Sequence, residues 1–286
     1  MNTSSNLSKV CAFAVVMAAL TACDKNESQV PNQNEESATA GARSSYDGGS
    51  TFLALAGNQL DKLSSNGGAV IKSVTLTGTQ GERILGIDFR PANGKLYGVS
   101  NASQIYLIDP ETGVATKVGT PFTPALGTMN VGFDFNPVVD RIRIVGDNGQ
   151  NLRINPNNGV TAGVDGNING APGARISAVA YSNSVAGATS TNLYDLDPAT
   201  DKLYRQDPPN AGTLVELGSL RLNIEGEGGF DIAPSGRNGL GLFQVGGKTT
   251  LFSVELRSGY SRVMAQYAVK YTAIAVIPGQ SSDQRW

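Results

Sequence analysis

The sequence predicts an all-β fold, a five-bladed β-propeller whose ring is closed by strands from both ends of the chain. Three observations support this prediction. A short phrase recurs every 44 to 51 residues, strand-like segments alternate with turns between its copies, and the two ends supply complementary parts of one repeat. A fixed period of this length, filled with short strands, is typical of propeller blades.

The phrase is clearest at residues 86–91, Gly-Ile-Asp-Phe-Arg-Pro, and returns at 132–137 and 229–234 with its glycine, aspartate and proline kept. Weaker copies occupy residues 178–183 and 273–278. The copies end at positions 91, 137, 183, 234 and 278, so the steps are 46, 46, 51 and 44 residues. We expect each copy to be the inner strand of one blade.

Each of the first two complete units continues with strand-like segments separated by Gly, Asn, Asp and Pro turns. In the first unit we expect strands at 95–99, 104–108 and 114–118; in the second, besides the inner strand at 133–135, at 141–145 and 151–154. Residues 155–159 occupy the slot of the turn at 109–113.

The next two units follow the same order. The expected strands are 192–196, 202–205 and 213–217 in one unit, and 239–243, 250–254 and 262–265 in the other. A longer turn after residue 181 accounts for the step of 51 residues.

The chain ends complement each other. Residues 52–55, 59–63 and 70–74 supply three strands without a preceding phrase, whereas 271–278 is a phrase with no strands after it. Joined, they complete a fifth blade and remove the exposed edges of an open sheet. A β-sandwich or an open stack of sheets is the alternative.

Composition excludes several chemistries. The 286 residues carry a net charge of -2, which gives no basic surface of the kind that nucleic acid requires. The chain contains no histidine, the commonest general base and metal ligand. Its two cysteines, Cys11 and Cys23, both precede the repeats, so the repeat region has no thiol nucleophile, zinc-thiolate site or disulfide.

The first 22 residues read as a signal peptide. The apolar run 11–20 is shorter than the roughly 20 residues that span a bilayer and has the length of a secretory h-region. Residues 20–23, Leu-Thr-Ala-Cys, resemble the lipobox of bacterial lipoproteins, which implies a lipid on Cys23. An ordinary signal peptide cut after Ala22, or a buried segment, is the alternative. Asp24 resembles an inner-membrane retention signal, and the choice of membrane stays open.

Residues 23–50 are rich in Asn, Ser, Glu, Gln and Gly, and we expect a disordered tether there. Its length would hold the domain on the order of 30 Å from the membrane. We therefore expect a propeller domain at 51–278, a short tail at 279–286, and a location in the bacterial cell envelope.

One stretch of the second full unit also carries a family resemblance. Residues 134–137 (Asp-Phe-Asn-Pro), 140–143 (Asp-Arg-Ile-Arg) and 149–153 (Gly-Gln-Asn-Leu-Arg) resemble the bacterial DUF4394 family, a domain of unknown function. The similarity extends over nearly all of 51–278. It implies a propeller-like architecture and an exported location, and it implies no chemistry.

Three aspartates, Asp88, Asp134 and Asp231, share one slot of the phrase. One hypothesis is a cation site on the axis, with Ca²⁺ as the candidate; another is a carboxylate pair for glycoside hydrolysis. The structural alternative, which we favour, is that each carboxylate accepts hydrogen bonds from backbone amides near the end of its strand. Alanine occupies this slot at Ala180 and Ala275.

Polar residues should gather at the rim where the inner strands begin, next to the loops between second and third strands. Cations in excess there suit an anionic or sugar-like ligand, although a solvated polar rim is the simpler interpretation. The candidate ligand-binding residues are Arg83, Asn130, Asp147, Asn148, Gln150, Arg175, Glu227 and Lys270.

Three arginines, Arg141, Arg143 and Arg153, cluster in the second full unit. We favour ion pairs between blades, with Asp140 and Asp147 as partners, over a surface for a partner's carboxylates or phosphates.

The leading functional hypothesis is a lipid-anchored, non-catalytic binding module for a protein or glycan of the cell envelope. The alternative is a glycosidase- or lactonase-like hydrolase that uses rim carboxylates, and a third is a structural partner in an assembly. We expect no cofactor, with Ca²⁺ as the alternative, and no nucleic acid.

Overall fold

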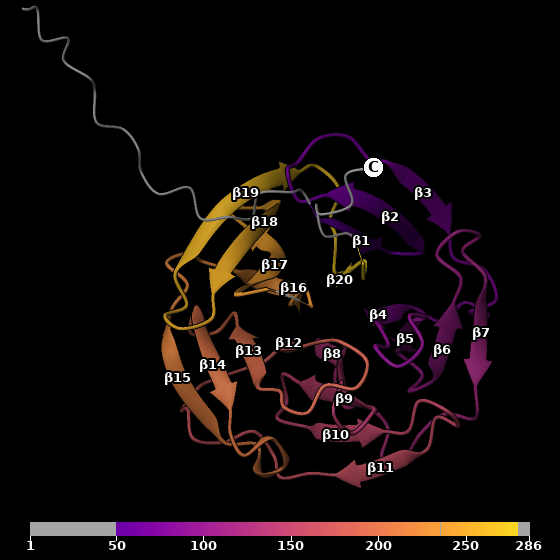
Figure 1. Cartoon of the computed structure of the whole chain (residues 1–286), viewed down its shortest axis with the longest axis horizontal. Coiled ribbons are helices and arrows are strands. Elements are labelled where there is room, and N and C mark those ends of the chain that lie inside the picture. Colours follow the sequence, from indigo (N-terminus) through magenta and orange to yellow (C-terminus); the bar gives the residue numbers. More distant parts are fainter. Residues whose placement is uncertain (1–49, 235, 280–286) are drawn as a thin grey trace, which may run out of the picture. The chain divides into compact units, whose positions relative to one another are not determined.

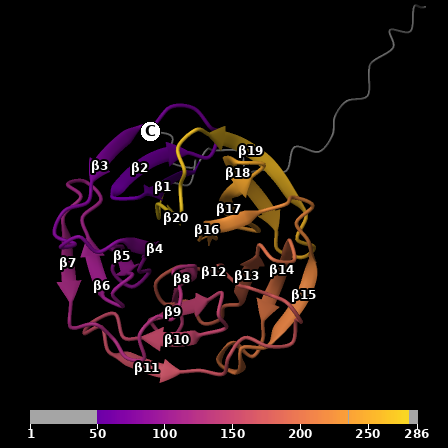
Figure 2. The same cartoon turned by 180° about the vertical axis from the view of Figure 1, so that it is seen from behind.

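The computed structural model describes residues 50–234 and 236–279, where five four-stranded antiparallel sheets stand round an axis (Figures 1 and 2). The predicted five-bladed propeller is confirmed, and the sandwich and open-stack alternatives are wrong. In this part of the chain the helical structure is the short 3-10 turn η1 (Pro209–Ala211). No helix among the described residues is long and apolar enough to cross a bilayer.

Each blade is named here from its inner strand outward. Blade 1 contains β20 (Ala273–Val276), β1 (Thr51–Ala56), β2 (Gln59–Ser64) and β3 (Lys72–Thr75). Blade 2 contains β4 (Ile84–Phe89), β5 (Leu96–Ser100), β6 (Ile105–Ile108) and β7 (Ala115–Val118). Blade 3 contains β8 (Val131–Asn136), β9 (Arg141–Gly146), β10 (Asn151–Ile154) and β11 (Thr161–Val164).

Blade 4 contains β12 (Ala178–Tyr181), β13 (Leu193–Asp197), β14 (Lys202–Gln206) and β15 (Leu214–Ser219). Blade 5 contains β16 (Glu225–Asp231), β17 (Asn238–Val245), β18 (Lys248–Glu255) and β19 (Ser261–Tyr267). Every inner strand coincides with a copy of the phrase. No strand was expected at β11, whose four-residue segment Thr-Ala-Gly-Val has a glycine in its interior.

The two ends of the chain meet in blade 1, as predicted. Strand β20 pairs antiparallel with β1, and Leu53 stands opposite Ala275. A buried hydrogen bond strengthens this junction: the Tyr271 hydroxyl donates to Asp61 on β2 over 2.7 Å. The strand that closes the ring therefore comes from residues more than 200 positions away in the sequence.

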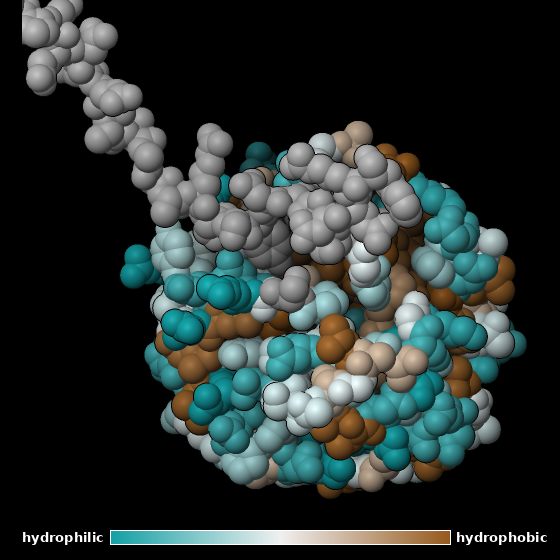
Figure 3. Space-filling view, viewed as in Figure 1, coloured by the Kyte–Doolittle hydropathy of each residue, from teal (hydrophilic) through white to brown (hydrophobic). Residues whose placement is uncertain are grey.

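The core is divided into five clusters, one between each pair of neighbouring blades. Between blades 1 and 2, for example, Leu55 and Leu60 pack in one cluster with Ile87 and Leu96. Hydrophilic and hydrophobic residues are interspersed on the face that Figure 3 shows. The stability of the ring thus resides in blade-to-blade packing.

Glycine in the first slot of the phrase permits the inner strands to approach closely. A Cβ on Gly86 would lie 2.5 Å from the Cβ of Phe133, and one on Gly132 would lie 2.6 Å from the Val179 nitrogen. Real Cβ atoms do not come this near. The same slot in blades 4 and 1 holds the next smallest residue, in Ala178 and Ala273.

The predicted signal peptide, the lipidated Cys23 and the tether up to residue 49 lie outside the described residues, as do residues 280–286 of the tail. Those assignments remain predictions.

Candidate functional site

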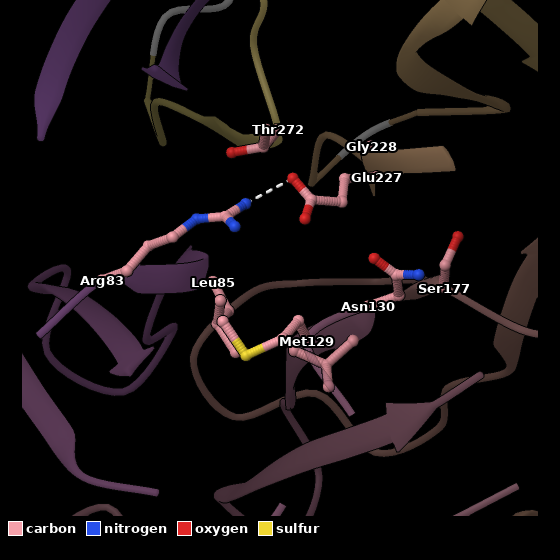
Figure 4. A pocket seen from close by; sticks show the side chains of 9 residues that line it. Arg83, Leu85, Met129, Asn130, Ser177, Glu227, Gly228 and Thr272 are labelled. Carbon is pink, nitrogen blue, oxygen red and sulfur yellow. Dashed lines mark hydrogen bonds and ion pairs between the residues drawn. The ribbon is translucent and has the colours of Figure 1, made fainter. Parts of the chain in front are cut away.

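The inner strands all run in one direction along the axis, so they begin at one rim and end at the other. We call these the start rim and the exit rim. At the start rim a small pocket lies over the axis, and we call it the mouth. Each of the five blades contributes one polar residue to its lining: Thr272, Arg83, Asn130, Ser177 and Glu227, for blades 1 to 5 in order (Figure 4).

An ion pair crosses the mouth. The Arg83 guanidinium of blade 2 donates to the Glu227 carboxylate of blade 5, and both side chains are partly exposed (Figure 4). The segments that carry them are 144 residues apart in sequence. A guanidinium and a carboxylate therefore face the same small space, supplying donors and an acceptor side by side.

Three neutral polar side chains complete the lining. The Asn130 amide donates to Asp147 over 2.9 Å, and the Thr272 hydroxyl donates to the Leu55 carbonyl over 3.4 Å. Ser177 is only 2% exposed, and its hydroxyl has no hydrogen-bond partner among the described residues. A buried hydroxyl without a partner is uncommon, because leaving it unpaired costs free energy.

The structure brings three of the eight predicted rim residues, Arg83, Asn130 and Glu227, together in the mouth. Arg175 and Lys270 are exposed and do not line it.

The remaining three, Asp147, Asn148 and Gln150, brace the loop that leads into β8. Asp147 accepts from Thr128 as well as from Asn130, and Gln150 donates to the Ala125 carbonyl over 2.9 Å. Asn148 accepts from the Gln150 backbone amide over 3.1 Å. Asp147 therefore holds Asn130 directly, Gln150 holds the loop that precedes it, and Asn148 closes its own turn.

Sequence reasoning missed Ser177 and Thr272. Both directly precede the two copies of the phrase that begin with alanine, Ala178 and Ala273. A signal was therefore present, in the form of a hydroxyl residue one position before each weak copy.

Deeper along the axis, toward the exit rim, Asp88, Asp134 and Asp231 converge. One carboxylate oxygen from each lies within 4.8 Å of the others, and the residues are 4%, 2% and 5% exposed. Between this cluster and the mouth the inner strands enclose a cavity of about 10 Å³, close to the smallest space that holds a water.

The carboxylates of blades 2 and 3 accept hydrogen bonds from backbone amides. Asp88 accepts from its own neighbour Phe89 over 2.6 Å and from Phe135 of blade 3 over 2.9 Å. Asp134 accepts from Tyr181 of blade 4 over 3.2 Å. Each bond between blades ties the end of one inner strand to its neighbour.

Asp231 completes the set. It accepts from Ile232 of its own blade and from Val276 of blade 1, both over 2.6 Å. Blades 4 and 1 carry Ala180 and Ala275 and have no aspartate to offer the next blade. In those next blades, 5 and 2, Asp231 and Asp88 accept from the amide of their own strand. Three carboxylates therefore satisfy the five amides at the ends of the five inner strands.

Burial raises the pKa of all three groups. Burial is the larger cause of the raised pKa of Asp88 and Asp134, and neighbouring carboxylates of the cluster add to it. Burial raises the pKa of Asp231 to about 6, while the amides of Val276 and Ile232 oppose the rise. Carboxyl oxygens at this spacing could hold a cation or share protons.

Two arginines of blade 3 form ion pairs, but within their own blade and not with the expected aspartates, so the prediction of pairs between blades is wrong for them. Arg143, which is 1% exposed, and Arg153 both pair with Asp165, over 2.6 and 2.7 Å. Asp140 instead pairs with Arg90 of blade 2. The Arg141 guanidinium donates to the Val139 and Asp140 backbone carbonyls.

Residues 59–275 match the family described as "Domain of unknown function (DUF4394)". No curated protein matches the chain. Among solved structures, the chain is 13% identical to a chain of the nidogen/laminin complex, with a TM-score of 0.44 and coverage of 82% of this chain and 100% of that chain.

Two further structures are similar to the chain. PorZ of Porphyromonas gingivalis is 14% identical, with a TM-score of 0.41 and coverage of 77% of this chain and 27% of that chain. Virginiamycin B lyase from Staphylococcus aureus is 18% identical, with a TM-score of 0.37 and coverage of 65% and 56%. Similarities at these levels carry no argument about function.

Proposed function

We propose that this chain, which belongs to the DUF4394 family, is a non-catalytic module that binds an acidic glycan of the bacterial cell envelope at the mouth of its propeller. The observation that carries the proposal is the mouth, where one polar residue from each of five blades lines a shallow depression over the axis. The depression has almost no free volume of its own, so a ligand would rest on it and would not enter it. A rigid closed ring fixes these residues without a cost of ordering when a ligand binds.

The chemistry of the mouth suits a sugar. Sugar hydroxyls both donate and accept hydrogen bonds, and the mouth offers a guanidinium, an amide, hydroxyls and a carboxylate. The buried hydroxyl of Ser177 has no partner among the described residues and is available to a ligand that reaches it. A protein partner would instead favour an apolar, aromatic patch at its centre.

The charge of the rim favours an acidic sugar. Arg83, Arg175 and Lys270 all lie just before an inner strand, and Glu227 is the carboxylate of the mouth. A carboxylate or phosphate on the sugar would replace Glu227 as a partner of Arg83, in the bidentate geometry that a guanidinium prefers.

Titration calorimetry with a tetramer of galacturonic acid tests the proposal. We expect the tetramer to bind, the uncharged galactose tetramer to bind at least tenfold more weakly, and Arg83→Gln to lose about tenfold in affinity, equivalent to about 1.4 kcal/mol. Lys95→Ala, an exposed cation in the β4–β5 turn, is the matched control and should bind normally.

Failure of both tetramers to bind would contradict the proposal that the ligand is a glycan. Release of reducing ends from the tetramer would contradict a non-catalytic role. If the protein captures an envelope protein and binds no glycan, the proposed ligand is wrong and the ligand is a protein.

The envelope location rests on Cys23, which we propose carries a lipid. Cys23→Ser should move the protein from the membrane fraction to the soluble fraction of the cell, and a variant that stays with the membrane would contradict the anchor.

A further inference from the structure

A groove of about 540 Å³ lies between blades 1 and 2 at the start rim, beside the mouth. Its walls are the β1–β2 turn, with Gly57 and Asn58, and the loop from Leu76 to Ile84 that leads from β3 to β4. The volume falls within the roughly 300–1,000 Å³ of small-molecule sites. Arg83 lines both the groove and the mouth, so the two spaces lie on either side of one side chain.

The groove is rich in hydrogen-bond donors that have no acceptor. The amides of Thr77 and Glu82 donate to the Gly113 and Thr79 carbonyls. By contrast, the four consecutive amides of residues 78–81 donate to no acceptor within the described part of the chain. Backbone amides are obligatory donors, so a run of four is left to solvent or to a ligand.

The backbone of this loop resembles known anion sites. Gly78, Gln80 and Gly81 have φ of +80°, +56° and +84°, and the intervening residue does not have a positive φ. The sign of φ alternates from Gly78 to Gln80 and stays positive at Gly81. Successive amides in turns of alternating sign form concave sites for anions. Unlike the two glycines, Gln80 has a Cβ that disfavours a positive φ, and the loop holds it in that conformation.

Side chains add to the same excess of donors. The hydroxyls of Thr77 and Thr79 and the amide of Asn58 make no hydrogen bond among the described residues. The lining carboxylate, Glu82, is already engaged: it accepts from Ser100 over 2.6 Å and pairs with Lys117 over 3.1 Å. The polar lining that remains available therefore favours a ligand that accepts hydrogen bonds.

We infer that this groove is a second subsite of the same ligand, which holds the carboxylate or phosphate of the sugar next to the one in the mouth. The inference rests on the proposed function and adds to it that the ligand is a chain of acidic sugars. Arg83, shared by both spaces, lies where the link between the two sugars would pass.

Chain length tests the inference. Galacturonic acid monomer should occupy the mouth, whereas the tetramer should reach the groove as well. We therefore expect the tetramer to shift the NMR amide resonances of residues 78–81, and the monomer to leave them unchanged. The double variant Thr77→Val, Thr79→Val should bind the tetramer about tenfold more weakly and the monomer normally.

Two variants serve as controls. Thr79→Ser keeps the hydroxyl and should restore most of the tetramer affinity in the Thr77→Val background. Thr189→Val, an exposed threonine in the loop between β12 and β13, should bind both sugars normally. Because the groove hydroxyls have no protein partner, the double variant should melt at the temperature of the wild type, which shows that its fold is intact.

The outcomes separate the inference from the proposed function. If Arg83→Gln weakens the monomer but the groove variants and the amides of 78–81 do not respond to the tetramer, the inference fails and the proposed function stands. If neither sugar binds the wild type, both fail. If the amides of 78–81 respond and the double variant weakens only the tetramer, both are supported.

Discussion

At the scale of the residue, the aspartate of the phrase accepts hydrogen bonds from inner-strand amides that a closed ring leaves without a partner strand. The inner strands have no neighbour on the axis side, so their edge amides are buried without a partner in any ladder. Asp88 and Asp231 each accept from two such amides, and Asp134 accepts from one. Two blades therefore dispense with the aspartate without leaving an amide unpaired.

This division of labour predicts unequal effects of asparagine. Asp88→Asn and Asp231→Asn replace one of two acceptor oxygens by a donor and should each lower the free energy of unfolding at pH 7 by about 1–3 kcal/mol. Asp134→Asn keeps an acceptor for the Tyr181 amide, so it should cost less than either. Urea denaturation measures the difference; equal losses in all three variants would contradict the assignment of amides.

The same cluster predicts how stability depends on pH. The pKa of Asp231 is raised from 3.8 to about 6, and burial and the neighbouring carboxylates also raise the pKa values of Asp88 and Asp134. A raised carboxyl pKa stabilises the fold fully below the unfolded value and loses that contribution as pH rises through the folded value. The contribution of the cluster should therefore decline from about pH 4 through pH 6 and above.

Melting curves between pH 4 and 7 test this sign. Asp134→Asn should flatten the decline, while the exposed control Asp207→Asn should follow the wild type. If the variant and the wild type change in parallel, proton sharing in the cluster is wrong. A rise in melting temperature with added Ca²⁺, reversed by a chelator and absent in Asp134→Asn, would show that a cation replaces the protons.

At the scale of the element, the turns between third and fourth strands join neighbouring blades. The turn at 109–113 and its counterpart at 155–159 share one pattern: the first residue's side chain accepts from the amide two positions on, and its carbonyl accepts from the closing glycine. Each closing glycine packs against a backbone carbonyl of the preceding blade, Thr75 for Gly113 and Val118 for Gly159. A turn that is local in sequence thus doubles as a contact between blades.

We predict that Gly159→Ala destabilises the protein more than Gly94→Ala. Both glycines have positive φ, at +72° and +65°, so both variants incur the same backbone strain of about 1–2 kcal/mol. A Cβ at residue 159 would also lie 2.5 Å from the Val118 carbonyl oxygen, whereas residue 94 faces open space. Urea denaturation should show an extra loss of about 1–3 kcal/mol at residue 159. Equal losses would mean that the turns do not join the blades.

At the scale of the whole molecule, the ring depends on one strand. The five core clusters lie between blades, and β20 supplies residues to two of them: Ala273 and Ala275 face blade 2, and Ile274 and Val276 face blade 5. Loss of β20 would therefore open both interfaces of blade 1. It would also expose the edge of β1 along its length.

Truncation after Lys270 should prevent cooperative folding. The truncation removes the buried side chains of Tyr271, Ile274 and Val276, each contributing about 1.5–3 kcal/mol, and the total is comparable with the stability of a typical domain. Truncation after Pro278 keeps β20 and should melt like the full chain. Calorimetry of the two truncated proteins decides; a cooperative transition at the wild-type temperature without β20 would show that the ring does not need closure.

Much of the candidate site could be placed from the sequence, and some of it could not. The position of Arg83, Asn130 and Glu227 just before or at the start of an inner strand predicts their rim, because every inner strand runs the same way. Which of the rim residues meet in the mouth depends on side-chain directions in five blades at once. The sequence pattern does not give these directions, so Ser177 and Thr272 were missed and Arg175 and Lys270 were included.

The sequence by itself determined the number of blades, the inner strand of each and the sharing of one blade by both ends, because a repeated phrase reports local periodicity and turn chemistry directly. Only the tertiary structure decided that three aspartates serve five amides, that Asp165 pairs with two arginines, and that a donor-rich groove adjoins the mouth. The aspartate cluster and the groove join residues from different blades, and the Asp165 pairs join different strands of blade 3. Their partners are fixed by the geometry of the closed ring, which no single stretch of sequence contains.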